Sequence, residues 1–344
     1  MQRLLLHRKD YRKILREQQV LLTALVQNQY RSDVIQLHQI AEYTFEDRGI
    51  YRVTFTDGHS YVLRAFRYDV RDDLLGQTAV FDYLEQQAYP APRLFRTHSG
   101  SPIATFKNWL AVLVSYLEGS LLNFSTHHLT QLGAKLGMLH AISEQTQTEA
   151  NHLPDSRLYP RQLPPQSFAS ATFTATLPRE LSTLYEASQT TIATLQHATS
   201  LPITLLHGDC WPHNAVLTPD KQATMIDWDC AGLGPAILDI GYLLLMCHLG
   251  KPQLQKMYAD SARIAAIVQG YCQYRRPTAN ELHVLREAVH FETARRVIAY
   301  DMLSHIDSDW QQDIPIQKEL ARFAISNEIA EIALQCFDKP ECSM

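Results

Sequence analysis

Three oxygen-bearing side chains in the middle of the chain have the spacing that phosphoryl transfer requires. Asp209 follows the dipeptide His207-Gly208, Asn214 comes five residues later, and Asp227 lies beyond a short polar turn. An aspartate can accept or orient a hydroxyl proton, whereas an asparagine and a second aspartate can jointly hold Mg²⁺ against nucleotide phosphates. We therefore predict an ATP-dependent kinase reaction with Asp209 as the catalytic base and Asn214 and Asp227 as ligands of the Mg-nucleotide.

The flanking residues indicate how the backbone brings these groups together. The apolar run 203–206 ends at Gly208, which permits a sharp turn and places Asp209 at the mouth of a loop. Two short strands joined by a polar turn are expected between Asn214 and Asp227. A hairpin of that length brings both side chains to the same end, where they can share one cation.

Two other interpretations of this stretch were considered. In one, Asp209 and Asn214 are ordinary loop residues and Asp227 caps a helix. In the other, the protein is a metal-dependent hydrolase whose ligands are His207, Asp209, His213, Asp227 and Asp229. The stretch lacks the His-x-His or His-x-x-x-His pair that would place two imidazoles on one ion, so the kinase interpretation is favoured.

The same stretch resembles the aminoglycoside phosphotransferase and choline kinase-like family, whose members share the protein-kinase-like fold. The family pattern H-G-D-x-x-x-x-N matches residues 207–214, its I-D-[WF]-[DE] matches residues 226–229, and its helical D-[LI] matches Asp239 and the next residue. The resemblance implies the catalytic and metal-binding roles given above. It also implies that His207 and Asp239 support the catalytic loop.

The first third of the chain has the element order of a kinase small lobe. Periodicity predicts helices at 10–28 and 72–87 and strands at 34–43, 50–56, 60–66 and 109–117. Later helices are predicted at 129–141, 179–196, 282–303 and 317–336, the third after a capping box at Thr278–Glu281. We expect an α+β, bilobal fold with an antiparallel-sheet lobe over residues 1–118 and a mainly helical lobe over residues 119–344.

The resemblance also implies nucleotide contacts in the first lobe. Arg64 stands on the third strand where kinases place a phosphate-binding lysine, and arginine can grip phosphates bidentately. Gly49 is the single glycine of the expected phosphate-covering loop. The expected hinge at residues 117–120, which begins with Leu117, would offer its backbone to adenine, and the preceding Tyr116 would also contact the nucleotide.

Two departures from the family pattern motivate an alternative function. Arg64 replaces the lysine, and Gln77 stands where its helical glutamate partner is expected, with Glu85 two turns away. An amide cannot form the ion pair. A nucleotide-binding pseudokinase that works as an interaction module is therefore the main alternative.

The acceptor is expected to be a small molecule with a hydroxyl group and an amine, such as an aminoglycoside, choline, ethanolamine or an amino alcohol. In the resembling family the acceptor binds between the catalytic loop and the carboxyl-terminal helices. The acidic side chains expected there are Asp229, Glu292 and Asp301, together with Glu287, Asp307 and Asp309.

Composition is consistent with this interpretation. The chain has 344 residues, of which 46% are apolar, enough for a large core. Its net charge of −5 argues against a nucleic-acid surface or a polybasic membrane anchor. The six cysteines form no C-x-x-C pair, and neither a signal peptide nor an apolar stretch of about 18 residues is evident. We expect a cytoplasmic protein that uses ATP and Mg²⁺, without nucleic-acid or membrane partners.

Overall fold

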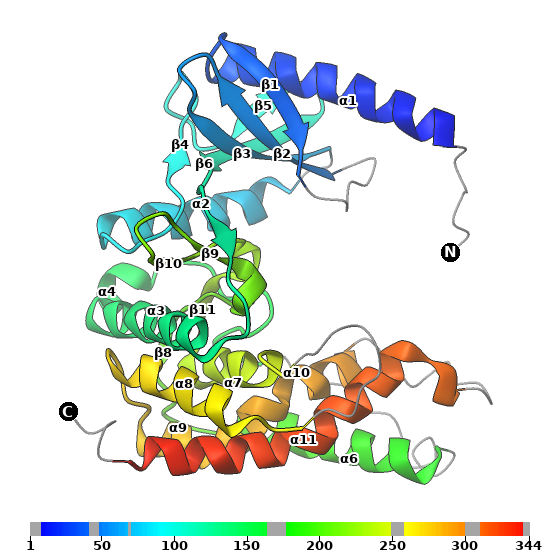
Figure 1. Cartoon of the computed structure of the whole chain (residues 1–344), viewed down its shortest axis with the longest axis vertical. Helices are drawn as coiled ribbons and strands as arrows, with labels where there is room; N and C mark the ends of the chain where they lie inside the picture. The colour runs from blue at the N-terminus through cyan, green and yellow to red at the C-terminus, as the bar shows by residue number, and fades with distance from the viewer. Residues whose placement is uncertain are drawn as a thin grey trace. The chain divides into compact units, whose positions relative to one another are not determined.

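The chain forms two compact units, Met1–Glu118 and Gly119–Met344 (Figure 1). The computed structural model describes residues 8–40, 48–67, 70–163, 177–248, 258–299 and 310–339.

The first unit is built on an antiparallel sheet with the strand order β1-β2-β3-β6-β4, in which β5 also pairs with β6. Its strands are β1 (Val34–Gln39), β2 (Arg48–Phe55), β3 (Ser60–Phe66), β4 (Leu94–Phe95), β5 (Ala104–Phe106) and β6 (Trp109–Ser115). Its helices are α1 (Arg8–Gln29) and α2 (Arg71–Gln86). The expected strands and helices of this unit are therefore present. The short strands β4 and β5 were not predicted, because two or three residues are too few to show an alternating pattern.

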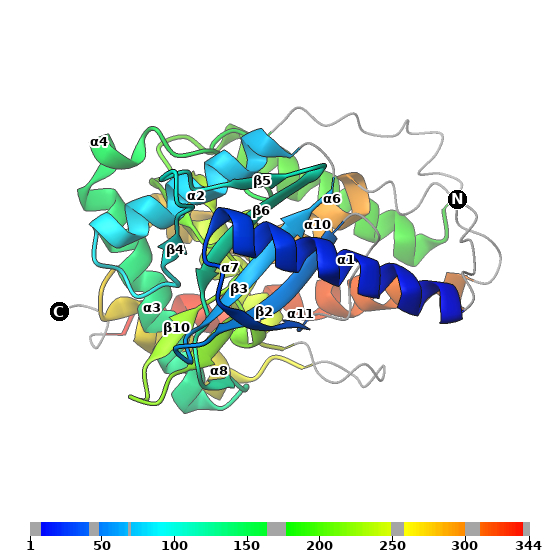
Figure 2. The same ribbon diagram turned by 90° about the horizontal axis from the view of Figure 1, so that it is seen from above.

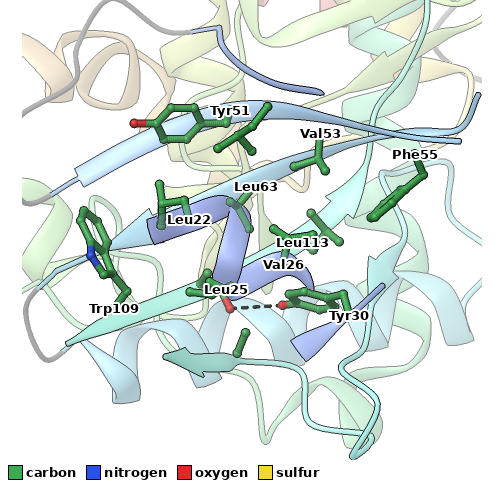
Figure 3. Packing of buried hydrophobic residues seen from close by; sticks show 14 residues of the cluster. Leu22, Leu25, Val26, Tyr30, Tyr51, Val53, Phe55, Leu63, Trp109 and Leu113 are labelled. Atoms are coloured by element: carbon green, nitrogen blue, oxygen red, sulfur yellow. Dashed lines mark hydrogen bonds between the residues drawn. The ribbon is translucent and has the colours of Figure 1, made fainter. Parts of the chain in front are cut away.

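One face of this sheet is covered by α1, which runs across the strands (Figure 2). Leu22, Leu25 and Val26 recur at the spacing of one helical face and pack with sheet residues such as Val53 and Leu63 (Figure 3). All five side chains have no exposed surface. Burying one such side chain contributes about 1.5–3 kcal/mol, so this contact is a major source of stability for the first unit.

The second unit is mainly helical. Its helices are α3 (Thr126–Gln145), α4 (Gln147–Ala150), α6 (Arg179–His197), α7 (Ala236–Met246), α8 (Ser261–Cys272), α9 (Ala279–His283), α10 (Leu285–Ala299) and α11 (Ile314–Phe337), with single-turn 3₁₀ helices η1 (Pro212–Asn214), η2 (Trp228–Cys230) and η3 (Trp310–Gln312). Its strands are β7 (Ser120–Leu121), β8 (Ile203–Leu206), β9 (Ala215–Leu217), β10 (Ala223–Met225) and β11 (Gly232–Pro235). They form two small sheets, β10-β9-β7 and β11-β8. An antiparallel sheet followed by a mainly helical part confirms the expected α+β class.

Helices α3 and α8 lie side by side and approach each other unusually closely. A β-carbon at Gly133 or Gly137 of α3 would overlap the backbone carbonyls of Ile267 and Tyr271, respectively, on α8. The missing side chains thus let the two backbones touch. One turn further along α3, His140 reaches the Tyr271 hydroxyl, with 2.9 Å between Nδ1 and Oη.

The prediction of a single helix over residues 282–303 was wrong in one respect. Two helices, α9 and α10, occupy the beginning of that range. The capping box is confirmed: Thr278 accepts from the amide of Glu281, and the Glu281 side chain accepts from the amide of Thr278. Helix α9 then ends at Val284, where ψ is 13°. This break lets α9 keep its capped start while α10 packs against α6 and α7.

Three buried histidines should make the second unit sensitive to acid. Burial lowers the pKa of His140, His248 and His290, that of His290 to about 4. A histidine with a lowered pKa takes up a proton on unfolding. Its stabilising contribution is therefore complete above about pH 6.5 and is lost as the pH falls towards 4. For His290 alone this contribution amounts to about 3 kcal/mol.

His290→Phe tests this prediction, because phenylalanine keeps the ring packing against Phe323 but cannot be protonated. Chemical denaturation at pH 7, 6, 5 and 4 should show a shallower loss of unfolding free energy for the variant than for the wild type. An equal pH dependence in both proteins would contradict the assignment.

Candidate active site

The loop that carries Asp209 begins where the buried strand β8 ends. At Gly208 the backbone φ is +79°, in the left-handed region that favours glycine. A β-carbon there would overlap the carbonyl oxygen of Cys230. Glycine therefore satisfies both a backbone and a packing requirement, and the chain can present Asp209 at the mouth of the loop.

His207 connects this loop to the segment that carries Asp227. Its Nδ1 accepts from the amide of Asp209 at 3.3 Å, so the ring proton lies on Nε2, which donates to the carbonyl of Ile226 at 2.9 Å. The imidazole is fully buried and packs on the Trp228 ring at 4.6 Å between centroids. The side chain thus fixes the residue before Asp227 relative to the loop.

Asp239, near the start of α7, accepts hydrogen bonds from the backbone of this loop. Its Oδ2 accepts from the amide of His207 at 2.7 Å, and its Oδ1 accepts from the amide of Gly208 at 3.1 Å. The carboxylate has no exposed surface. It satisfies two buried amides that belong to neither a helix nor a strand.

Asp209 is held by hydrogen bonds to both of its carboxylate oxygens. Tyr242 donates to Oδ1, and the Asn214 amide donates to Oδ2 at 2.7 Å and to the Asp209 carbonyl at 2.9 Å. Burial raises the pKa of Asp209 above its ordinary value, although the bond from Tyr242 acts in the opposite direction. The site therefore holds a partly desolvated carboxylate in one orientation, as a proton acceptor requires.

Tyr242 was not among the residues singled out from the sequence. It lies one helical turn after Asp239, so both side chains project from α7 on the same side. That spacing was visible in the sequence. The contact with Asp209 was not, because it depends on how α7 packs under the loop.

The hairpin formed by β9 and β10 brings Asn214 and Asp227 together. Its register pairs Ala215 with Met225, and the amide of Ile226 donates to the carbonyl of Asn214 at 2.9 Å. Asp227 has a left-handed backbone with φ at 63°, and its side chain is exposed. A non-glycine residue in this region is uncommon, and such strained positions cluster at ligand sites.

The donor set at this end of the hairpin suits Mg²⁺. The Asn214 side chain uses its NH₂ group on Asp209, which leaves the carbonyl oxygen as a ligand. The exposed Asp227 carboxylate supplies a second hard oxygen. Two protein ligands are typical of Mg²⁺ that is also held by substrate phosphates.

The nucleotide contacts expected from the resemblance lie in the first unit. Arg64 is buried on β3 between Ile50 and Val112 of the neighbouring strands. Gly49 lies on β2 and is also buried. The preceding residues 44–47 of the expected phosphate-covering loop lie outside the described residues, and the side chain of Arg48 is not described.

Tyr116 and Leu117 follow β6 and are partly buried. The Tyr116 amide donates to the carbonyl of Ser60 at 3.1 Å, and the Arg52 guanidinium lies 4.0 Å from the centre of the tyrosine ring. This amide is therefore used within the first unit.

The two residues considered as helical partners of Arg64, Gln77 and Glu85, both lie on α2. Gln77 is buried with 9% of its surface exposed. Glu85 is exposed and lies 3.9 Å from the Arg93 guanidinium. Glu85 thus has a cationic neighbour other than Arg64.

The acidic residues expected around the acceptor differ in their environments. Asp229 is half-buried in η2, two residues after Asp227. Glu292 is buried, with bonds to Arg295 at 2.9 Å and Arg296 at 2.6 Å, and it accepts from Tyr159 at 3.3 Å. Its charge is matched inside the protein, which argues against a role for Glu292 in binding a cationic acceptor. The third candidate, Asp301, lies outside the described residues, as do Asp307 and Asp309.

A pair of glycine substitutions tests the packing requirement at Gly208. Gly100 has a φ of +80° but no atom within 4 Å of an added β-carbon, so Gly100→Ala should cost only about 1–2 kcal/mol of backbone strain. Gly208→Ala should cost about 3 kcal/mol or more, because the overlap with Cys230 adds to the same strain. Denaturation followed by circular dichroism measures both, and equal losses would refute the packing role.

Comparisons with solved structures support the fold. The chain superimposes on an amicoumacin kinase in complex with AMP-PNP, Ca²⁺ and Ami, with a TM-score of 0.60 and 16% identity, covering 93% of this chain and 97% of that one. An aminoglycoside phosphotransferase from Alicyclobacillus acidocaldarius gives 0.60 and 15%, covering 93% and 96%. A microcompartment-associated aminopropanol kinase gives 0.59 and 18%, covering 92% and 98%.

Sequence comparisons assign the family. A search of curated proteins gave no significant match. Within the described residues, no helix combines the length and the apolar character needed to cross a bilayer. The model of the phosphotransferase enzyme family matches residues 44–279, which is more than half of the chain. The protein therefore belongs to the phosphotransferase enzyme family, the aminoglycoside phosphotransferase-like group with a protein-kinase-like fold, and is an enzyme that phosphorylates hydroxyl groups.

Proposed function

We propose that this enzyme transfers the γ-phosphoryl group of Mg-ATP to a hydroxyl group of a small, amine-bearing molecule. The observation that carries the proposal is the direct contact between Asp209 and Asn214, together with the hairpin that places Asp227 next to Asn214. The residues proposed as the proton acceptor and the two hard oxygen ligands therefore lie on adjoining segments at one end of one hairpin. Kinase chemistry requires this combination.

In the proposed reaction Asp209 orients the acceptor hydroxyl and takes its proton. Tyr242 and Asn214 each bind one oxygen of the carboxylate and prevent it from rotating. Positioning of this kind contributes much of the rate enhancement in phosphoryl transfer, since the reaction needs little covalent chemistry from the protein. Mg²⁺ held by Asn214 and Asp227 would neutralise charge on the phosphates.

The first unit is proposed to bind the rest of the nucleotide. Arg64 would contact the phosphates, Gly49 would allow a close backbone approach, and the backbone of Tyr116 and Leu117 would contact adenine. The amicoumacin kinase structure contains an ATP analogue and a divalent cation, which supports an adenine nucleotide and a metal in a protein of this fold.

An amine in the acceptor is supported by two observations. Asp229 follows the proposed metal ligand Asp227 by two residues and can place a carboxylate near the acceptor. One similar structure is named as an aminopropanol kinase, whose substrate combines an amine with a hydroxyl group. Hydroxyl-bearing amines of low molecular weight are therefore the first class to test.

The alternatives make different predictions for one assay. ATP consumption would be measured with a panel of amino sugars, amino alcohols and serine-containing proteins. The pseudokinase alternative, which Gln77 motivates, predicts thermal stabilisation by Mg-ATP without turnover on any member. The hydrolase alternative predicts phosphatase or esterase activity with a transition metal. Among the described residues, no group of three or more His, Cys, Asp or Glu side chains is arranged to hold a metal, so they lend this alternative no support.

Asp209→Ala should lower the turnover number about 100-fold or more, because the hydroxyl loses its proton acceptor. The variant should stay folded, since burial already raises the pKa of this carboxylate and its charge does not favour the folded state. Asp220→Ala, at an exposed position in the turn of the same hairpin, is the matched control and should retain activity. Wild-type turnover in Asp209→Ala would rule out the assigned base.

Asp227→Ala should abolish the contribution of Mg²⁺ to ATP binding. Isothermal titration calorimetry with ATP, in the presence and absence of Mg²⁺, measures this contribution. In the wild type the cation should tighten binding. In the variant the two affinities should be equal, and a retained Mg²⁺ effect would exclude Asp227 as the ligand.

A further inference from the structure

A chain of buried polar side chains leads from Asp239 away from the active site. His140 Nε2 lies 3.4 Å from Asp239 Oδ2, and His140 Nδ1 lies 2.9 Å from the Tyr271 hydroxyl. Arg275 in turn donates to the same hydroxyl at 2.9 Å. At most 6% of the surface of any of these four residues is exposed.

The far end of this chain is anchored by two carboxylates. The Arg275 guanidinium donates to Glu281 from Nη2 at 2.9 Å and to Glu144 from Nε at 2.9 Å. Glu281 also closes the capping box by accepting from the Thr278 amide at 2.7 Å. The guanidinium is therefore fixed in the orientation that presents Nη1 to Tyr271.

The chemistry of the two ends determines the direction of every hydrogen bond between them. Arginine can only donate, so the Tyr271 oxygen accepts from Arg275, and its single proton is available to be donated to Nδ1 of His140. Nδ1 then accepts, and the proton of the neutral imidazole lies on Nε2. A carboxylate can only accept, so the bond between His140 and Asp239 must also run from the Nε2 proton to the Asp239 oxygen.

This direction matters for the catalytic loop because Asp239 Oδ2 is shared. It accepts from the amide of His207 at 2.7 Å and from His140 at 3.4 Å. The longer contact suits a neutral donor, whereas an imidazolium would draw the carboxylate to about 2.7–2.9 Å. A charged His140 would thus compete with the loop amide for the same oxygen.

The groups facing His140 act on its pKa in both directions. They are Asp239 on α7, Tyr271 on α8, Arg275 after α8 and Glu281 on α9, with Glu144 on the next turn of α3. Burial lowers the pKa of His140, the Asp239 carboxylate acts in the opposite direction, and the charge of Arg275 lowers it further. A second proton on Nδ1 would also leave the Tyr271 hydroxyl proton without its acceptor.

We propose that Tyr271 and Arg275 are positioning residues for phosphoryl transfer, because they set the direction of this chain and leave Asp239 free to hold the catalytic loop. Neither residue touches a substrate. Their effect on turnover rests on the proposed function, whereas the state of His140 can be measured without it.

The test compares Tyr271→Phe with the wild type by NMR of ¹⁵N-labelled histidine, with the His140 signals assigned from their loss in His140→Gln. The wild type should show neutral His140 protonated on Nε2 from pH 8 to 5. In Tyr271→Phe the second proton should bind about one pH unit higher or more, because Nδ1 has lost its donor. Tyr274→Phe is the matched control, since Tyr274 follows closely and is 51% exposed.

Kinetics provide the second measurement. At a pH where NMR shows His140 charged in Tyr271→Phe but neutral in the wild type, the variant should have a turnover number about tenfold lower, with KM for ATP and acceptor nearly unchanged. At pH 8, where His140 is neutral in both proteins, the turnover number should recover towards that of the wild type. Arg275→Lys keeps the charge but loses the planar fork whose separate nitrogens reach Tyr271, Glu281 and Glu144, and it should show the same pH dependence. Arg275→Lys replaces Tyr271→Phe in this test if the Tyr271→Phe protein does not fold.

Three results would overturn the proposal. They are wild-type His140 protonated on Nδ1, an unchanged His140 titration in both variants, and a loss of turnover that is equal at every pH, which indicates a purely structural role. A wild-type protein without turnover on the whole panel overturns the proposed function instead, and the NMR measurement still decides the direction of the chain.

Discussion

One buried carboxylate holds the loop that carries Asp209 in place. Asp239 accepts hydrogen bonds from the consecutive amides of His207 and Gly208, which the turn removes from any helix or strand. An unpaired buried amide is costly, and a charged acceptor forms the stronger bond. Asp239 belongs to α7, a helix buried on all sides. Its hydrogen bonds therefore attach the loop to the packed core of the second unit. These two bonds fix the backbone of the turn just before Asp209, and the bonds from Tyr242 and Asn214 then orient its carboxylate.

The cost of burying that carboxylate is offset by the same contacts. Two amides and the neutral His140 surround it, so its oxygens are satisfied without a cation at the site. His140 reaches it because α3 and α8 pack with their backbones in contact at Gly133 and Gly137. The close packing of α3 against α8 thus affects the geometry of the loop at His207 and Gly208, which belongs to neither helix.

The two aspartates of the site are separated in role by their surroundings. Asp209 is partly buried, has both oxygens bonded and has a raised pKa, which suits a group that receives a proton. Asp227 is exposed and sits in a strained backbone conformation, which suits a ligand that meets an ion from solution. The buried carboxylate of Glu292 has a different environment again, because Arg295 and Arg296 pair with its charge.

Much of this could be predicted from the sequence because the signals are local. The hairpin between Asn214 and Asp227, the turn at Gly208 and the amphipathic spacing of α1 depend on residues close together in the chain. The break at Val284 and the short strands β4 and β5 could not be predicted in this way. Packing decides those features, and a few residues carry too little pattern to reveal them.

By itself the sequence determined which side chains can do chemistry and the local turns that present them. Only the tertiary structure decided which groups those side chains contact. The bond from Tyr242 to Asp209, the pairing of Glu292 with Arg295 and the contact of His140 with Tyr271, 131 positions away, are examples. The physical reason is that burial and hydrogen-bond partners set the charge and orientation of a polar group, and most of those partners come from distant parts of the chain.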